Sequence, residues 1–189
     1  MDISEPCRNL GPIDIETLSA ALLKEGEGIW MANTERQNNY EVHKQTRSLV
    51  LVFCDGPMSN LTVSKESAWD RLADAAVPVM HELIARSYPP GGTIIRAMAA
   101  NLVAGGRINT HYDAHASFRH SHRIHVPITT NPRVRFMIDG RPFRLEVGQA
   151  YEINNQKHHS VMNTGKEDRI TFIFDYLPPE KIGSSQLTN

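Results

Sequence analysis

The sequence predicts a mainly β fold, a jelly roll or barrel with helices packed on its outside. From residue 93 onward, seven or eight short segments rich in β-forming residues follow one another within about 85 residues. Turn signals separate these segments, a pattern typical of jelly rolls and barrels. Before residue 90 the apolar residues of two longer stretches recur at helical spacing instead.

Length and composition predict one domain. A chain of 189 residues with 40% hydrophobic content closes one sizeable core but not two. We expect this domain to span residues 1–182, with helices and N-terminal strands at about 13–90 and the jelly-roll core at about 93–178. The segment 183–189 has too few apolar residues to pack, so it is predicted to be a flexible tail.

Charge and cysteine content narrow the function classes. The 20 Lys and Arg residues nearly balance 21 Asp and Glu residues, which argues against nucleic acid and anionic membranes as partners. The acidic start and the lack of a long apolar run predict a soluble, cytoplasmic protein. Cys7 and Cys54 are expected to be reduced and structural. A small molecule or a peptide is the expected partner, and oligomeric state is not predicted.

Two helices and one strand are predicted before residue 90. The first helix covers residues 15–24, with Asp14 as its N-cap and Gly26 just beyond its end. The apolar run 48–54 is too short for a helix and predicts a buried strand. The second helix covers residues 64–87, where Pro78 is expected to kink or interrupt it.

The strands of the core are bounded by turn residues. Asp139-Gly140 is a strong two-residue hairpin signal, and Thr164-Gly165 marks another turn. The predicted strands are residues 93–103, 123–129, 134–138, 143–147, 150–153, 159–162 and 169–176.

Histidines are concentrated in one part of the chain. Seven of the nine lie within the 49 residues from His111 to His159. In an extended chain His111 and Asp113 point to the same side, so the two side chains can hold one metal ion. Taken alone, a single His-x-Asp is more often a surface or turn dipeptide.

A third ligand must come from elsewhere in the chain. His158 and His159 begin another predicted strand, and only one of these neighbours can face the metal. Two imidazoles and one carboxylate on one side of a metal leave positions open, as in Fe(II) oxygenases.

Arg169 begins the last predicted strand, ten positions after His159. An inward guanidinium without a partner is costly, and its planar fork suits a carboxylate such as the distal one of 2-oxoglutarate. The alternative is an ion pair with Asp113, Asp168 or Asp175.

Four motifs together resemble one family, the aspartyl/asparaginyl β-hydroxylases, which include bacterial proline 3-hydroxylase-like enzymes. The family signature is His-x-Asp, Arg-x-His-hydrophobic-Pro, His-x-x-x-Asn-x-Gly, and an Arg ten residues after that His. The matches here lie between Thr93 and Pro178, under half of the chain: His111-Tyr-Asp113, Arg123-Ile-His125-Val-Pro, His159-Ser-Val-Met-Asn163-Thr-Gly165, and Arg169.

The resemblance implies a double-stranded β-helix, the jelly roll also found in cupins, with the metal at its open end. It implies Fe(II) on His111, Asp113 and His159, and hydroxylation of a substrate C–H bond with 2-oxoglutarate and O2. The Asn-x-Gly turn and the spacing to Arg169 both count from His159, which favours it over His158.

The resemblance also implies how the co-substrate is bound. Arg123 and His125 are expected to help bind 2-oxoglutarate, and Arg169 to anchor its far carboxylate. Some animal members lack the carboxylate ligand, so Asp113 places this chain with the bacterial three-ligand members and weakens any transfer of the animal substrates.

Candidate substrate contacts lie on two other segments. His115, Arg119 and His122 follow the first ligands on a loop, where active-site lids are common. A solvated polar loop explains them equally well. His43 and Arg47 alternate on an extended stretch and offer a polar wall, although a surface ladder on a sheet is slightly favoured.

Two other classes of protein use similar residues. A non-oxidative cupin-type metal isomerase or small-ligand sensor has a similar barrel, but needs no cationic anchor like Arg169. A zinc hydrolase uses the same three ligands with a metal-bound water. The sequence does not identify the substrate: a free amino acid, a peptide side chain or another small polar metabolite suits a pocket lined by Arg and His.

Overall fold

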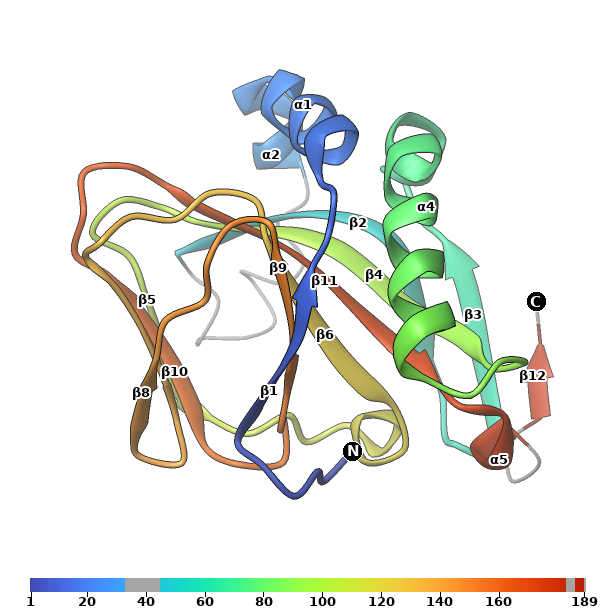
Figure 1. The fold of residues 1–189 in the computed structure, drawn as a ribbon. Coiled ribbons are helices and arrows are strands. Elements are labelled where there is room, and N and C mark those ends of the chain that lie inside the picture. The colour runs from blue at the N-terminus through green and yellow to red at the C-terminus, as the bar shows by residue number, and fades with distance from the viewer. Residues whose placement is uncertain (33–44, 183–185, 189) are drawn as a thin grey trace.

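Two β-sheets face each other in the computed structural model, which describes residues 1–32, 45–182 and 186–188 (Figure 1). The larger sheet contains, in spatial order, β1 (Cys7–Pro12), β9 (Gln149–Ile153), β6 (His122–Pro127), β11 (Arg169–Leu177), β4 (Thr93–Leu102), β2 (Thr46–Asp55), β3 (Asn60–Lys65) and β12 (Gln186–Thr188). The smaller sheet contains β5 (Arg107–His111), β10 (His159–Asn163), β7 (Val134–Ile138) and β8 (Arg141–Phe143). This is the jelly roll that the sequence predicts.

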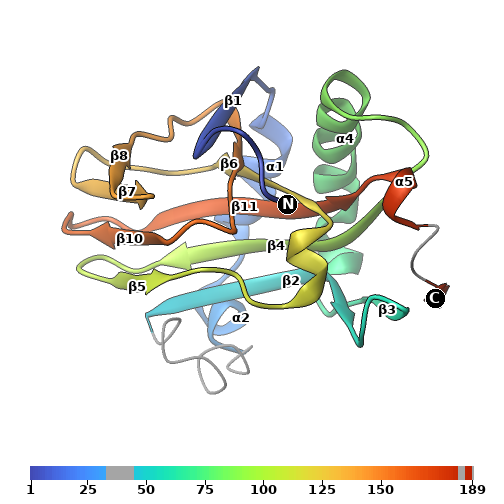
Figure 2. The same cartoon turned by 90° about the horizontal axis from the view of Figure 1, so that it is seen from below.

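Helices cover the face of the larger sheet that points away from the smaller one (Figures 1 and 2). They are α1 (Glu16–Lys24), α2 (Glu27–Ala32) and α4 (Trp69–Ser87), whereas the short α5 (Pro179–Ile182) lies just beyond the end of β11. Leu18 and Leu22 of α1 and Leu72 and Leu83 of α4 are buried in one core with the sheet. Their helical spacing gives each helix one apolar side, which packs on the β-strands.

Strand alternation divides the side chains of the larger sheet between two environments. Phe172 and Phe174 of β11 are buried in the core beneath the helices. Arg169 and Ile173 lie on the opposite face and line a cavity between the two sheets. Because successive side chains of a strand point to opposite faces, one strand builds the core and the site together.

The N-terminal half differs in part from the sequence prediction. The first helix begins one residue later than predicted, and the carboxylate of Asp14 accepts a hydrogen bond from the backbone N–H of Glu16 at 2.9 Å. The second helix begins at Trp69 because residues 60–65 form β3, which pairs with β2. It runs through Pro78 as one helix, so the predicted interruption does not occur.

The β core follows the prediction more closely. The hairpin at Asp139-Gly140 is confirmed: both residues are left-handed, with φ of 51° and 72°, as a type I′ turn requires. The strand predicted at 143–147 lies instead at Arg141–Phe143. Strands β1 and β5 are not predicted by the sequence, and within the tail expected to be flexible, Gln186–Thr188 pair with β3.

Two general predictions can also be compared with the structure. Cys7 and Cys54 are both free, as expected. Across the described ranges, no helix is long and apolar enough to cross a membrane.

Candidate active site

A cavity of about 620 Å³, counting its open mouth, lies between the two sheets. We call it the metal cavity, because the predicted ligands line it. Its walls come from both sheets: Thr46, Met98, Ala100, Leu102, Arg123, His125, Arg169 and Ile173 from the larger, and Ile108, His111, Phe136, His159 and Val161 from the smaller, with Asp113 just after β5. The mixture of apolar walls and a few convergent polar groups is typical of small-molecule sites.

The two histidines of the predicted metal site are cross-strand neighbours. His111 on β5 pairs with His159 on β10 in the antiparallel register, which places their ring centroids 4.4 Å apart. The Nδ1 of His111 lies 2.7 Å from the carbonyl oxygen of Asn109, and the Nδ1 of His159 lies 3.0 Å from that of Lys157. A carbonyl only accepts, so each Nδ1 carries the proton and each Nε2 carries the lone pair that a metal needs.

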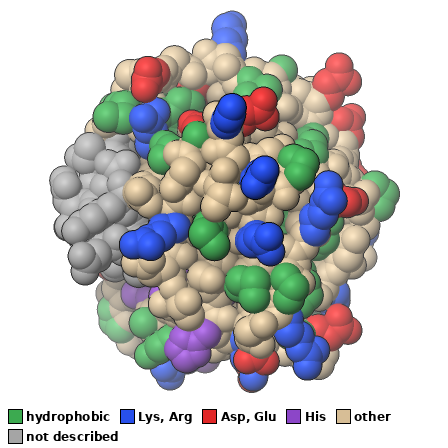
Figure 3. Space-filling model, turned by 90° about the vertical axis from the view of Figure 1, so that its left-hand side faces the viewer, with side chains coloured by type: hydrophobic (Ala, Val, Ile, Leu, Met, Phe, Trp, Pro, Cys, Tyr) green, Lys and Arg blue, Asp and Glu red, His purple; other side chains and the backbone are tan. Residues whose placement is uncertain are grey.

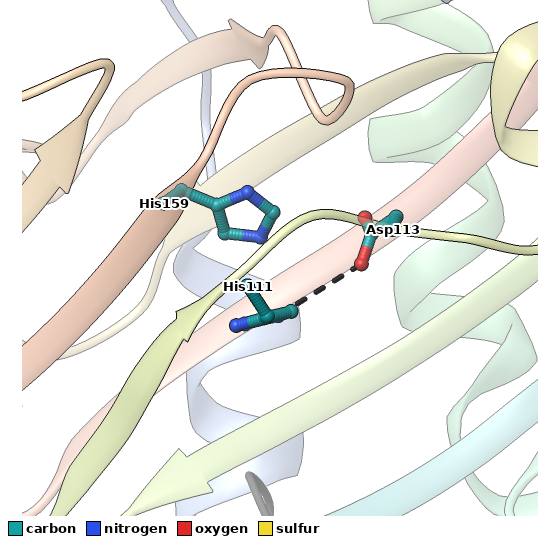
Figure 4. A group of neighbouring side chains, drawn as sticks. All are labelled: His111, Asp113 and His159. Atoms are coloured by element: carbon teal, nitrogen blue, oxygen red, sulfur yellow. Dashed lines mark ion pairs between the residues drawn. The ribbon is translucent and has the colours of Figure 1, made fainter.

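Asp113 completes the group from the segment that follows β5 (Figure 4). Its backbone N–H donates to the carbonyl of Asn155 at 3.1 Å, and its Oδ1 lies 3.9 Å from the Nε2 of His111. One ligand atom from each of His111, Asp113 and His159 lies within 4.8 Å of the other two. Two fixed imidazole tautomers and one carboxylate therefore fit a divalent metal ion.

The choice between the adjacent histidines agrees with their burial. His158 is exposed, and its ring packs edge-on against Tyr112 at 5.7 Å. His159 is buried in the metal cavity.

Asp113 is held by a buried network of charges. Arg123 donates from Nη1 to Asp113, and from Nε to Oδ1 of Asp175 at 3.0 Å. Arg96 lies on the far side of Asp175, with 3.9 Å between its Nη1 and Oδ2. The sequence singles out neither Arg96 nor the pairing of Arg123 with two aspartates, because both depend on the register of β4, β6 and β11.

The network shifts the pKa values of its members. Burial raises the pKa of the Asp113 carboxyl, but the charge and hydrogen bond of Arg123 together with the charges of His159 and His111 outweigh this, and the pKa falls to about 2. Burial also raises the pKa of Asp175, which stays above its ordinary value despite the neighbouring arginines. Asp113 is therefore ionised at neutral pH, as a metal ligand must be.

Arg169 differs from Arg123 in having no acidic partner in the described ranges of the chain. Arg169 is 4% exposed, and no carboxylate of the described residues pairs with its guanidinium. All three aspartates considered as alternatives bond elsewhere: Asp113 and Asp175 to Arg123, and Asp168 to the side chain of Asn101 and the backbone of Ala104. Burial alone lowers the pKa of Arg169 to about 10. A buried cation facing a cavity is a site for an anion.

His125 and Phe136 lie between the metal ligands and Arg169. The Nδ1 of His125 is buried without a hydrogen-bond partner among the described residues. Burial, followed by the charges of Arg123 and Arg169, holds the pKa of His125 well below its ordinary value. The ring of Phe136 lies 5.9 Å from that of His125 and stacks at 6.4 Å on His159. The sequence does not identify Phe136 as a site residue, because its inward position on a predicted strand is its only distinguishing feature.

Among the described residues, the candidate substrate contacts do not line the metal cavity. His115 lies beside Arg96 and Ser117, Arg119 is exposed at the end of a short 3-10 helix, and His122 bonds Glu152 at 2.5 Å. Arg47 forms an ion pair with Glu27 at 3.2 Å. His43 lies outside the described residues. A substrate role for these residues stays a prediction.

Comparison with known proteins gives one family match. The model of the family described as aspartyl/asparaginyl beta-hydroxylase matches residues 18–179. No curated protein sequence matches the chain.

Solved structures show the same fold at low identity. An oxidoreductase of the 2OG-Fe(II) oxygenase family from Burkholderia pseudomallei has a TM-score of 0.52 and 12% identity, covering 70% of this chain and 67% of its own. The nickel complex of the non-heme monooxygenase ThoJ has a TM-score of 0.57 and 16% identity over 93% and 75% of the two chains. The viral collagen prolyl hydroxylase of Paramecium Bursaria Chlorella virus-1, in complex with 2OG, has a TM-score of 0.52 and 7% identity over 93% and 97%.

Proposed function

Because this chain belongs to the aspartyl/asparaginyl β-hydroxylase family, we propose that it is an Fe(II)- and 2-oxoglutarate-dependent hydroxylase. Its substrate class is an amino acid, a peptide side chain or a similar small polar molecule. The fold shared with the solved oxygenases and the geometry of the metal cavity support the proposal.

The observation that carries the proposal is the burial of Arg169 without a carboxylate partner from any residue that the structure describes. The metal cavity is lined by Arg169 as well as by the metal-binding group. A dicarboxylate with a keto acid at one end would offer that end to the metal held by His111, Asp113 and His159, and its other carboxylate to the Arg169 guanidinium. Such a ligand offsets the cost of burying this charge.

The side chains of the metal cavity have different roles in this proposal. His111, Asp113 and His159 would hold Fe(II), which together with 2-oxoglutarate and O2 supplies the oxidising chemistry when bound. Arg169 would fix the far carboxylate by a bidentate pair. The apolar walls would exclude water from the reacting atoms.

Arg123 and His125 have separate roles in this proposal. The guanidinium of Arg123 already bonds Asp113 and Asp175, so its first effect is to orient the metal-binding carboxylate. His125 has a buried Nδ1 with no described partner and would contact the co-substrate. A direct contact of Arg123 with 2-oxoglutarate stays a prediction.

The alternative functions need the metal-binding residues of the cavity but not Arg169. A cupin-type isomerase, a ligand sensor or a zinc hydrolase uses the metal-binding residues but has no need for a buried cation opposite them. The lack of a carboxylate partner for Arg169 within the described part of the chain favours the oxygenase over all three.

The proposal is tested by anaerobic titration of the Fe(II)-loaded protein with 2-oxoglutarate, following the visible absorption band of the keto acid chelate. Wild type is expected to develop the band and saturate. Arg169→Ala should keep Fe(II) binding but need at least about 100-fold more 2-oxoglutarate, since a buried charge-assisted pair is lost. Arg169→Lys should recover only part of the affinity.

A control variant and two contradicting outcomes make the result decisive. Arg141→Ala, on an exposed residue of β8, should titrate like wild type. Absence of the band in wild type, or an unchanged titration of Arg169→Ala, contradicts the co-substrate assignment. Succinate formation with Fe(II), 2-oxoglutarate and O2, and its stimulation by candidate amino acids and peptides, then identifies the substrate.

A further inference from the structure

A second cavity lies next to the metal cavity. It measures about 840 Å³ with its open mouth, and we call it the outer cavity. Its lining consists of Thr130, Asn131, Pro132, Val134, Arg135, Phe136, Pro142, Phe143, Arg144, Leu145 and Arg169. Two of these residues, Phe136 and Arg169, also line the metal cavity. They therefore form a shared wall between the two spaces.

The lining of the outer cavity is both cationic and apolar. Arg135, Arg144 and Arg169 contribute positive charge, and no Asp or Glu is among the lining residues that the structure describes, although Glu146 lies beside the cavity with its Oε1 3.8 Å from the Nε of Arg144. The rest of the wall is largely aromatic, proline and aliphatic. The face of the molecule in Figure 3 likewise carries Lys and Arg across its central part, where Asp and Glu are sparse. This combination suits an anionic group attached to an apolar body.

The hydrogen-bonding capacity of Arg169 points to a second acceptor. A guanidinium has five N–H donors, and one bidentate carboxylate uses two of them. No described residue accepts from the others, although Arg169 is only 4% exposed. The nearby amide of Asn131 is committed, since its Oδ1 accepts from the backbone N–H of Arg133 at 2.9 Å and its Nδ2 donates to Asn163 at 3.1 Å. A ligand in the outer cavity supplies the missing acceptor.

The ring of Phe136 keeps the two cavities distinct. It is 3% exposed and lies 5.8 Å from the Arg169 guanidinium carbon, while its other neighbours are His125 and His159. An anion in the outer cavity thus meets Arg169 without reaching the metal-binding residues.

We propose that the outer cavity binds a small organic carboxylate with an apolar body, and that this ligand weakens the binding of 2-oxoglutarate in the metal cavity. The effect on 2-oxoglutarate binding rests on the proposed function. Both anions use one guanidinium and repel each other across it, so each lowers the affinity of the other by the same factor. The outer cavity then acts as an inhibitory site for such carboxylates.

The first test is direct binding of 3-phenylpropionate to the full-length, metal-free protein, measured by calorimetry, with 3-phenylpropionamide as the uncharged control. The acid should bind and the amide should bind at least about tenfold more weakly, since it lacks the charge. Arg144→Glu reverses a charge at the outer cavity on a side chain that is 75% exposed, so the fold is preserved. The variant should bind 3-phenylpropionate about five- to tenfold more weakly than wild type.

The matched control is Arg141→Glu. This residue is exposed on β8, three positions before Arg144 in the sequence, but it is not among the residues that line the outer cavity. It makes the same change in net charge and should alter binding less than about twofold. If both variants weaken 3-phenylpropionate equally, or neither does, the acid is not bound in the outer cavity and the proposal is overturned.

The second test measures the coupling. 3-Phenylpropionate should raise the 2-oxoglutarate concentration needed for the absorption band in wild type, but less so in Arg144→Glu. An unchanged 2-oxoglutarate titration overturns the shared use of Arg169. An equal effect in wild type and Arg144→Glu shows competition inside the metal cavity and overturns the outer site. If the acid binds as predicted but wild type never forms the band, the proposed function fails while the outer site stands.

Discussion

Replacing Arg169 by methionine should stabilise the ligand-free protein while abolishing co-substrate binding. Burial alone lowers the pKa of Arg169 from its ordinary value to about 10. At about 1.36 kcal/mol per pKa unit, keeping this charge buried costs roughly 3 kcal/mol. Methionine fills similar space without the charge. We expect the free energy of unfolding to rise by about 1–3 kcal/mol, because replacing a buried charge by an apolar side chain is often stabilising.

The direction in which this cost changes with pH determines the pH at which stability should be measured. A base whose folded-state pKa is lowered destabilises the fold wherever it is protonated, so the cost is fully present below about pH 10 and is relieved as the pH rises through that value. Urea unfolding of the metal-free protein at pH 7.5, followed by circular dichroism, therefore measures the whole effect. In the metal-loaded proteins, adding 2-oxoglutarate should further stabilise wild type but not the variant.

Arg123→Met is the matched control, since it removes the same group from another buried site. Arg123 bonds two buried aspartates, and its loss leaves both carboxylates without compensation. We expect a loss of about 3–5 kcal/mol. If Arg169→Met instead lowers stability by more than about 1 kcal/mol, Arg169 has a structural partner and the argument for a bound anion is wrong.

Three further predictions concern the ligands, the response to acid and the backbone. His159→Ala should lower Fe(II) affinity more than about 100-fold by calorimetry, whereas His158→Ala should leave it nearly unchanged; the reverse result would place the ligand one residue earlier. Burial first, then two neighbouring arginines, hold the pKa of His125 well below its ordinary 6.5, so the unfolded chain binds the extra proton in acid. Stability should fall by up to about 1.4 kcal/mol per pH unit below pH 6.5, and His125→Gln should remove that part of the slope in urea unfolding at pH 5.5 and 7.5. At Gly92 a Cβ would lie 2.3 Å from a backbone carbonyl oxygen, while at Gly26 it meets nothing within 4 Å. Thermal unfolding should show Gly92→Ala destabilised by more than about 2 kcal/mol and Gly26→Ala by less than about 0.5 kcal/mol; equal effects would contradict the close approach.

The sequence predicts those parts of the fold that local patterns determine. The strand at Val134–Ile138 and the turn at Asp139-Gly140 are found as predicted, because alternation and left-handed residues act within a few positions. Strand Arg107–His111 was not predicted, since its mostly polar, partly exposed residues carry no apolar pattern. Its strand conformation comes from pairing with His159–Asn163, about 50 positions away in the sequence. Pairing of this kind is not visible in a local window.

The same limit applies to the site, and the two buried arginines show it. Alternation is enough to predict that His111, Asp113 and His159 can share a metal, but it does not say which carboxylate each arginine meets. From the sequence alone Arg169 had three candidate aspartate partners. In the fold, Arg123 takes two of them and main-chain and amide groups hold the third. The guanidinium of Arg169 is left buried and facing two cavities. Since selection rarely keeps an uncompensated buried charge, the absence of a described protein partner is itself the reason to assign Arg169 to a ligand.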